Sequence, residues 1–321
     1  MRNISIIFTA ILLSLFISFH AIVDQDKPTK VICDKAWQLI ESKKYIEAMD
    51  LCTKALDIDP NNSTAIGYRS YALLMNNDNW GYLREEDYET IIKDCNKAIN
   101  IDSKNDIAYL CRGVSYIYTK KFNYSISDLN RSLELDPNFS DTYFFIGDFY
   151  YSNDDFQTAI LYFSKALEIS PYDVKIYRYR GDAYFSEGND DKAVKDYSEA
   201  IKINPNDAIT YHNRGLAYYY LGEYEKAIRD YDQAIELSSS KGFIFFRRGN
   251  AYLKKDDLDK AIIDYKKSIS LDPDNINVKK YLIKAYITKY SLFICILAFL
   301  LVCINIFIVL KRCRRRRQFP S

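Results

Sequence analysis

Apolar residues recur along most of the chain at the spacing expected of amphipathic helices, and the stripes come in pairs. In one stretch, Tyr211, Gly215 and Tyr218 are separated by four and then three residues, which places them on one face of a helix. Gly222 then interrupts the pattern, and a second apolar stripe starts at Tyr224. The pattern predicts a helix, a short turn and a second helix.

This predicted hairpin returns along the chain at a constant interval of 34 residues. A glycine marks one position of its first helix: Gly113, Gly147, Gly181, Gly215 and Gly249. Proline follows the second helix of several units, because proline cannot continue a helix. A fixed period of this length is typical of stacked repeats. We therefore expect an all-α fold in which each hairpin packs against the next.

The repeated positions resemble the motif of the tetratricopeptide repeat (TPR) family. That motif has small residues at its eighth, twentieth and twenty-seventh positions. The eighth positions of this chain are Ala36, Ser70, Gly113, Gly147, Gly181, Gly215 and Gly249. The twentieth positions are Ala48, Ile91, Ser125, Ala159, Ala193, Ala227 and Ala261. The resemblance implies a right-handed superhelical solenoid of about seven helix-turn-helix units plus a capping helix.

The motif also sets the expected boundaries of the repeats. The units are 29–62, 63–105, 106–139, 140–173, 174–207, 208–241 and 242–275, and a helix over 276–290 would cap them. The second unit departs from the motif, because Ile91 replaces a small residue and nine extra residues lie around Asn76–Glu85. We expect that insertion to lengthen the turn between its two helices.

Two apolar segments flank the array. Residues 1–23 contain a long uncharged run after Arg2, which is typical of a signal peptide or an uncleaved signal anchor, and residues 24–28 form a short linker. Residues 291–310 contain no charge and, as a helix, are long enough to span a bilayer. The segment that follows, 311–321, is a basic tail that begins with "KRCRRRR".

The positive charges predict an orientation, since Lys and Arg beside a membrane segment stay on the cytoplasmic side. Both flanks place the array on the non-cytoplasmic side and the C-terminus in the cytoplasm, in a single-pass or two-pass membrane protein. An alternative is a tail-anchored receptor or co-chaperone whose repeats lie in the cytosol. In that alternative the N-terminal run is not a signal.

No catalytic, cofactor-binding or metal site is predicted. The chain has two histidines, His20 and His212, and no glycine motif for phosphate. Asp196, Asp230 and Asp264 recur with the repeat, which indicates a solvated or helix-pairing face rather than an acid–base pair. A net charge of +1 without a basic face argues against nucleic acid, and no small-molecule substrate is expected.

The cysteines of the first three repeats are expected to be buried thiols. Cys52 and Cys95 share the twenty-fourth position of the repeat, which is a packing position. An exported array would permit disulfides, and Cys95–Cys111 is then the pair to test.

Function is expected on the concave wall that the TPR resemblance implies, which is built by the first helices. Positions two, five, nine, twelve and thirteen of the motif line that wall. The residues there that we expect to bind a partner are Phe144, Tyr151, Lys175, Arg178, Phe185, His212, Leu216, Tyr219, Tyr220, Phe243, Phe246 and Asn250. Such an aromatic groove suits an extended or helical peptide of a protein partner.

Chaperone-binding members of the family hold a C-terminal carboxylate with basic and amide side chains. Arg178, Asn213 and Arg247 fit that arrangement, but Asp182 would repel a carboxylate and Phe243 cannot attract one. The predicted function is therefore a membrane-anchored scaffold for protein–protein interaction, without enzymatic activity of its own. A noncatalytic subunit that positions a partner enzyme is a further alternative.

Overall fold

The computed structural model describes residues 28–76, 83–238 and 240–318, and within these ranges every regular element is a helix. The fold is therefore all-α, as expected. The predicted signal or anchor segment 1–23 lies outside the described residues, as do residues 77–82 of the insertion.

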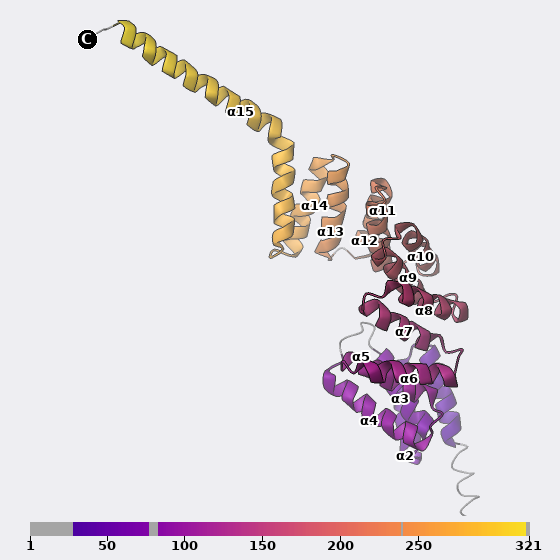
Figure 1. The fold of residues 1–321 in the computed structure, drawn as a ribbon. Helices are drawn as coiled ribbons and strands as arrows, with labels where there is room; N and C mark the ends of the chain where they lie inside the picture. The colour runs from indigo at the N-terminus through magenta and orange to yellow at the C-terminus, as the bar shows by residue number, and fades with distance from the viewer. Residues whose placement is uncertain (1–27, 77–82, 239, 319–321) are drawn as a thin grey trace, which may run out of the picture. The chain divides into compact units, whose positions relative to one another are not determined.

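The described helices form two compact units, and the first unit ends at Pro171. Its helices are, in chain order, 28–41, α2 (Tyr45–Ile58), α3 (Ser63–Met75), α4 (Glu85–Ile101), α5 (Asp106–Tyr118), α6 (Phe122–Leu135), α7 (Ser140–Ser152) and α8 (Phe156–Ile169). Each helix from α2 to α7 packs against the next one along the chain (Figure 1). The first helices of neighbouring hairpins also touch, since α5 contacts both α3 and α7.

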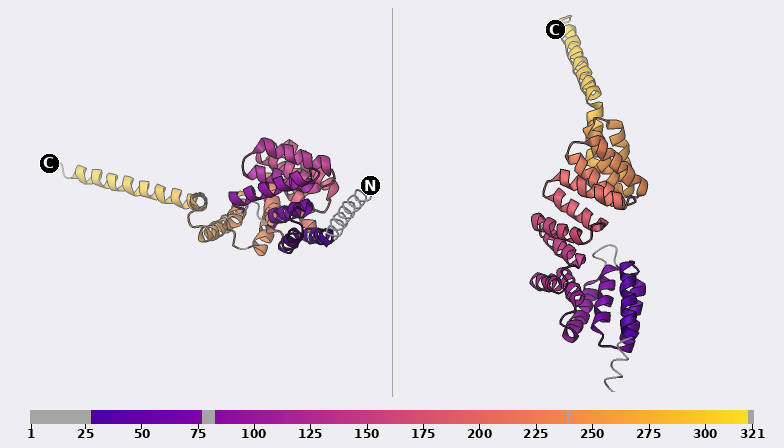
Figure 2. Two further views of the ribbon diagram at one scale, coloured as in Figure 1. Left: turned by 90° about the horizontal axis from the view of Figure 1, so that it is seen from below. Right: turned by 90° about the vertical axis from the view of Figure 1, so that its right-hand side faces the viewer.

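The second unit begins at Tyr172. It contains α9 (Val174–Ser186), α10 (Asp190–Ile203), α11 (Ala208–Tyr220), α12 (Tyr224–Leu237), α13 (Gly242–Lys254), α14 (Leu258–Leu271) and α15 (Ile276–Gln318). Its helices are stacked as pairs, as the further views in Figure 2 show. Helix α11 contacts both α9 and α13, so these three first helices form one wall of the unit. We call this wall the α9–α11–α13 face.

The turn inside each hairpin depends on one residue with a left-handed backbone. Gly188 and Gly222 have φ angles of 86° and 79° at the same position of successive repeats. Glycine adopts this conformation without the steric cost that a Cβ atom imposes. Lys43, Lys120, Asp154 and Asp256 have φ angles of 58° to 62° at that position in other repeats. The turn geometry is thus a property of the repeat and does not require glycine.

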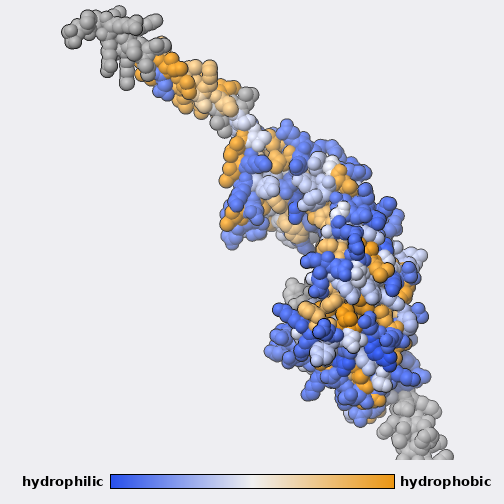
Figure 3. All heavy atoms as spheres, in the orientation of Figure 1, coloured by the Kyte–Doolittle hydropathy of each residue, from blue (hydrophilic) through white to orange (hydrophobic). Residues whose placement is uncertain are grey.

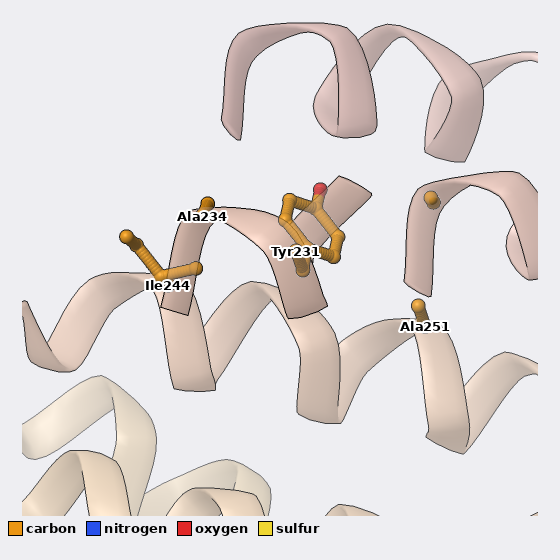
Figure 4. Packing of buried hydrophobic residues seen from close by; sticks show 5 residues of the cluster. Tyr231, Ala234, Ile244 and Ala251 are labelled. Atoms are coloured by element: carbon orange, nitrogen blue, oxygen red, sulfur yellow. The ribbon is translucent and has the colours of Figure 1, made fainter. Parts of the chain in front are cut away.

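The two helices of a hairpin approach closely where a glycine faces an aromatic ring. A Cβ atom on Gly215 would lie 2.9 Å from Cε1 of Tyr231, which is closer than atoms can pack. Tyr231 is fully buried with Ala227 and Ala234 of α12 and with Ile244 and Ala251 of α13, as Figure 4 shows. The glycine that marks the period in the sequence therefore makes room for the tyrosine of the second helix.

The C-terminal helix α15 differs from the separate capping and membrane helices that we expected. Among the described residues, no single helix has both the length and the apolar character needed to cross a membrane. Helix α15 bends by 59° between Ile276–Ser291 and Cys295–Ile308. Only the two parts taken together have the length and apolar composition of a membrane span. The first part packs against α14. Helix α15 continues to Gln318, so part of the expected basic tail is helical.

Candidate functional site

Most of the residues predicted to bind a partner lie together on the α9–α11–α13 face. Helix α9 supplies Lys175, Arg178 and Phe185, helix α11 supplies His212, Leu216, Tyr219 and Tyr220, and helix α13 supplies Phe243, Phe246 and Asn250. Because α11 contacts both of the other helices, these residues belong to one surface of the second unit.

The two remaining predicted residues, Phe144 and Tyr151, belong to α7 in the first unit. Phe144 is only 2% exposed, and its ring centre lies 5.6 Å from that of Phe163. Phe144 is thus a core residue rather than a surface for a partner. Tyr151 is partly exposed and packs beside Phe156 at 5.7 Å. The prediction failed for Phe144 because the side chain at this fifth position of the repeat turns into the core.

Aromatic rings hold one end of the face in place. Phe185 of α9 meets Tyr220 of α11 edge-on at 5.5 Å, and Tyr220 in turn meets Tyr219 edge-on at 5.7 Å. Tyr220 is 61% exposed despite these contacts. Rings that are already ordered lose little conformational entropy when a partner covers them. This end of the face therefore offers exposed aromatic area at a low entropic cost.

The other end of the face joins α11, α13 and α15. His212 meets Phe243 edge-on at 4.9 Å, and Phe243 remains 47% exposed. Phe246 packs against Tyr281 of α15 at 5.2 Å. Asn250 is buried, and its Oδ1 accepts a hydrogen bond of 2.8 Å from the hydroxyl of Tyr265. Asn250 therefore stabilises the hairpin instead of presenting its amide to a partner.

A chain of hydrogen bonds crosses from α9 to α11. Oδ1 of Asp182 accepts a bond of 2.6 Å from the Tyr197 hydroxyl and one of 2.9 Å from Nδ2 of Asn213. Oδ1 of Asn213 lies 3.0 Å from Nδ1 of His212. Since the amide NH₂ of Asn213 already faces Asp182, its oxygen must accept the proton on Nδ1. This contact assigns the neutral His212 tautomer, which leaves Nε2 as an acceptor.

Burial raises the pKa of Asp182 to about 6, although Tyr197, Arg178 and Asn213 act in the opposite direction. Arg178 is itself 3.4 Å from Asp207. The amide of Asn213 is thus occupied by an acidic neighbour at the place where a chaperone-type site would use it for a carboxylate. The geometry agrees with the departure from that arrangement seen in the sequence.

The sequence analysis missed an aromatic cluster in the first unit. The ring of Trp37 lies 4.9 Å from Tyr68, 6.0 Å from Tyr71 and 6.0 Å from Phe139. Trp37, Tyr68 and Phe139 line a cavity of about 370 Å³ together with Asp102, Asp106 and Asp136. The signal was available in the sequence, since Trp37 and Tyr71 occupy the ninth position of their repeats, which is one of the positions expected on the concave wall.

No group of three or more His, Cys, Asp or Glu side chains within the described ranges could hold a metal ion. The carboxylates that recur with the repeat are instead paired with arginines of the first helices. Asp196 binds Arg180 and Asp264 binds Arg248, each through two hydrogen bonds of 2.7 to 2.8 Å. Of the two roles expected for these carboxylates, the structure assigns the pairing of helices.

Stacked helical hairpins with a shared wall of first helices define a class of repeat proteins that bind other proteins. Family models described as tetratricopeptide repeats match residues 140–173, 208–241 and 243–275, and a third model, described as a TPR repeat, matches 181–222. The chain therefore contains tetratricopeptide repeats between residues 140 and 275. No curated protein matches its sequence.

Solved structures with a similar fold are TPR proteins of low sequence identity. The structure of YrrB, described as a TPR protein with an unusual peptide-binding site, is 20% identical with a TM-score of 0.52, and the alignment covers 58% of this chain and 96% of YrrB. The C-terminal part of a TPR protein from Cytophaga hutchinsonii is 19% identical with a TM-score of 0.54, covering 77% of this chain and 98% of that one. These likenesses support the fold.

The APC/C hetero-tetramer Cut9-Hcn1 contributes a chain that is 19% identical with a TM-score of 0.55. The alignment covers 79% of the present chain but 55% of that chain. The present chain thus spans about half the length of this relative. Repeats of this family mediate protein–protein interaction, and this chain is a scaffold of that general kind.

Proposed function

We propose that this chain is a membrane-anchored scaffold that recruits a protein partner through the α9–α11–α13 face of an exported repeat array. The observation that carries the proposal is the gathering of half-exposed aromatic side chains on three touching first helices. Tyr220 and Phe243 are 61% and 47% exposed, and both are held by other rings. A peptide segment of a partner would cover this area and exclude water from it.

The polar groups on the face suit a peptide better than a purely apolar ligand. His212, Asn213 and Arg178 stand among the rings, and each is partly buried. Such groups give orientation and register to a chain that lies across aromatic area. The partner is therefore a protein segment with apolar side chains and polar backbone groups. No small-molecule substrate is part of this proposal.

The membrane anchor in this proposal is the distal part of α15. Large apolar side chains between Phe293 and Ile308 are 41% to 67% exposed, and they form the orange part of this helix in Figure 3. A contiguous apolar surface of this kind needs a lipid or protein cover. The run of basic residues from Lys311 supports a lipid cover and a cytoplasmic end for the helix. The uncharged run in 1–23 supports export of the array.

Binding can be tested by selecting peptides against the full-length protein in nanodiscs and measuring their affinities. We expect Tyr220→Ala to weaken the selected peptides by about tenfold, since exposed aromatic anchors dominate such contacts. Ile263→Ala is the matched control, because Ile263 is 64% exposed on the second helix α14. If the selected peptides bind Tyr220→Ala, Ile263→Ala and the natural protein with equal affinity, the α9–α11–α13 face is not the binding surface.

Orientation can be tested with protease and two epitope tags, one after Ser321 and one within 77–82. Export to the cell surface predicts that protease removes the internal tag from intact cells and spares the C-terminal tag. In sealed organelle vesicles the opposite result is expected, because the array lies in the lumen. If the array is found in the cytosol, the exported scaffold is wrong and the tail-anchored cytosolic receptor replaces it.

A further inference from the structure

The second helices of the last three repeats each bury a tyrosine, and the hydroxyl groups of two of them are paired. Tyr197 donates to Asp182 at 2.6 Å, and Tyr265 donates to Asn250 at 2.8 Å. In both cases the acceptor is the ninth residue of the same repeat. The repeat thus provides a standard internal partner for this hydroxyl.

The repeat between these two lacks that partner. Its tyrosine is Tyr231, which is fully buried, and its ninth residue is Leu216, which cannot accept a hydrogen bond. The Tyr231 hydroxyl has no hydrogen-bond partner. In Figure 4 its oxygen lies at the end of the ring remote from Ala251. An unpaired buried hydroxyl destabilises a fold, and phenylalanine would fill the same space without one.

A second buried polar atom without a partner belongs to the ring that packs against Tyr231. Nε2 of His212 is buried without a hydrogen-bond partner, and the ring centres of His212 and Tyr231 are 5.9 Å apart. Nδ1 of His212 is held by Asn213, so Nε2 presents a lone pair. Burial lowers the pKa of His212, and the positive charges of Arg247 and Lys241 act in the same direction, while the hydrogen bond with Asn213 opposes them. The lowered pKa favours the neutral ring.

Arg247 of α13 adds a positive charge to this region. It acts to lower the pKa of both His212 and Tyr231, so it stands within electrostatic range of both side chains. Its guanidinium lies 6.0 Å from the ring of Phe246, and the described part of the chain provides it with no ion-pair partner. The group therefore contains one acceptor, Nε2 of His212, and two donors, the Tyr231 hydroxyl and the Arg247 guanidinium.

We propose that His212, Tyr231 and Arg247 together bind one neutral amide group of the partner. The N–H of the amide would donate to Nε2 of His212, and its carbonyl oxygen would accept from Tyr231 and Arg247. A carboxylate has no N–H for His212, and an ammonium group would be repelled by Arg247. The amide comes either from the peptide backbone or from an Asn or Gln side chain. This inference rests on the proposed function, since it names the chemistry that the α9–α11–α13 face recognises.

Phe243 packs against one member of this group. Its ring lies edge-on to His212 at 4.9 Å and is nearly half exposed. A side-chain rotation of Phe243 would uncover the buried atoms without a change in the backbone. This rotation of Phe243 would give a bound partner access to His212 and Tyr231.

The test uses the two histidines of the chain as reporters. Full-length protein in nanodiscs, with ¹⁵N-labelled imidazoles, is titrated with three capped peptides, acetyl-AAQAA-amide, acetyl-AAEAA-amide and acetyl-AAAAA-amide. The His212 signal is assigned by its loss in His212→Gln. We expect the Nε2 resonance to move upfield, as it does when an unprotonated nitrogen accepts a hydrogen bond.

The three peptides distinguish the sources of the amide. A Gln peptide that binds about fivefold more tightly than the Ala peptide identifies a side-chain amide, since one added hydrogen bond is worth about that factor. Equal binding and equal shifts with all three peptides identify the backbone. Preferential binding of the Glu peptide, or no shift with any of them, overturns the proposal.

Two conservative variants separate binding from folding. Tyr231→Phe should weaken peptide binding about fivefold to tenfold while the unfolding midpoint stays equal or rises, since no internal bond is lost. Tyr265→Phe should lower the unfolding midpoint without changing the affinity, because it leaves Asn250 unpaired. If Tyr231→Phe binds normally while Tyr220→Ala does not, the amide site is wrong and the proposed function stands. If both variants bind normally, both proposals fail.

Discussion

Arg214 binds Asp230 through two hydrogen bonds of 2.8 Å each, and its third nitrogen reaches Ser198 at 3.1 Å. Arg214 lies on α11, Asp230 on α12 and Ser198 on α10. One guanidinium thus joins the two helices of its own hairpin to the second helix of the preceding hairpin. The same three-helix contact recurs with Arg112, Asp128 and Asn96, and with Arg248, Asp264 and Asp232.

Removing this contact should loosen the stack locally. The side chains of Arg214 and Asp230 are 18% and 8% exposed, so loss of the arginine leaves a nearly buried carboxylate. We expect Arg214→Ala to lower the free energy of unfolding by about 2–3 kcal/mol, measured by urea denaturation. In a repeat protein the effect should stay near the mutation, with faster hydrogen exchange in α10 to α12 than in α5.

Arg131 provides the matched control for that variant. Its ion pair with Glu134 is exposed, with side-chain exposures of 45% and 65%. Such pairs contribute little in water, so Arg131→Ala should leave the urea midpoint unchanged. An equal loss of stability in both variants would contradict the role given to the three-helix contact.

Close approach of the hairpin helices predicts the effect of a single methyl group at Gly215. Gly215→Ala would set a Cβ atom 2.9 Å from Cε1 of the buried Tyr231. Overpacking of this kind costs about 1–3 kcal/mol, while alanine gains about 1 kcal/mol as a better helix former. We expect a net loss of stability in thermal or urea unfolding.

Gly222 separates this steric effect from a general sensitivity to glycine replacement. Its φ is 79°, and nothing lies within 4 Å of where a Cβ atom would stand. Gly222→Asn should therefore be nearly neutral, because Asn tolerates a left-handed backbone. A stable Gly215→Ala protein would show that the helices can move apart at no cost.

Asp182 makes stability depend on pH. Burial raises its pKa from 3.8 to about 6, so the folded state favours the protonated carboxyl. The contribution of the protonated Asp182 carboxyl to the free energy of unfolding is full below pH 3.8 and is lost as the pH rises to 6. Asp182→Asn should therefore stabilise the protein at pH 7 by about 1–3 kcal/mol and have less effect at pH 4. The amide oxygen can still accept from Tyr197 and Asn213.

Urea midpoints at pH 4 and pH 7 check this expectation. Asp274→Asn serves as the control, because Asp274 is exposed in the turn before α15. If Asp182→Asn raises the urea midpoint equally at pH 4 and pH 7, ionisation of the Asp182 carboxyl is not the cause of the stabilisation.

Buried thiols in the first unit predict a loss of stability in alkali. Burial raises the pKa of Cys33 from 9.0 to about 11 and that of Cys52 from 9.0 to about 12. The unfolded chain ionises these thiols first, so the stability that they contribute below pH 9 falls as the pH rises to 11. Replacing both by alanine should flatten the fall in urea midpoint over this window. An unchanged slope would assign the alkaline effect to tyrosines alone.

The pair Cys95 and Cys111, singled out in the sequence for a disulfide test, is fully buried as free thiols. Burial raises the pKa of Cys111 well above its usual range, and a hydrogen bond with Cys95 raises it further. The two sulfur atoms are thus neighbours. Mass spectrometry of the natural protein, with its free thiols alkylated during extraction, would show whether its compartment oxidises the pair.

The sequence by itself determined the helices, their turns and their period, because these depend on local spacing. Gly215 and Tyr231 illustrate this point. A glycine in the first helix and a large ring in the second helix recur at fixed positions, and this recurrence indicates both the repeat and the packing of its hairpin. The family likewise follows from the sequence, because small residues at fixed positions are needed wherever such helices cross. The all-α fold is therefore the part of the architecture that the local pattern predicts by itself.

Only the tertiary structure decided which side chains are free to act. Phe144 and Phe243 both occupy positions of the motif that line the wall, yet the first lies in the core and the second is nearly half exposed. Whether a buried hydroxyl finds an acceptor depends on which side chain the other helix of the hairpin places beside it, Asn250 for Tyr265 and Leu216 for Tyr231. The exposure of a side chain and its hydrogen-bond partners depend on the atoms that surround it in the folded protein. Periodicity along the chain therefore does not predict them.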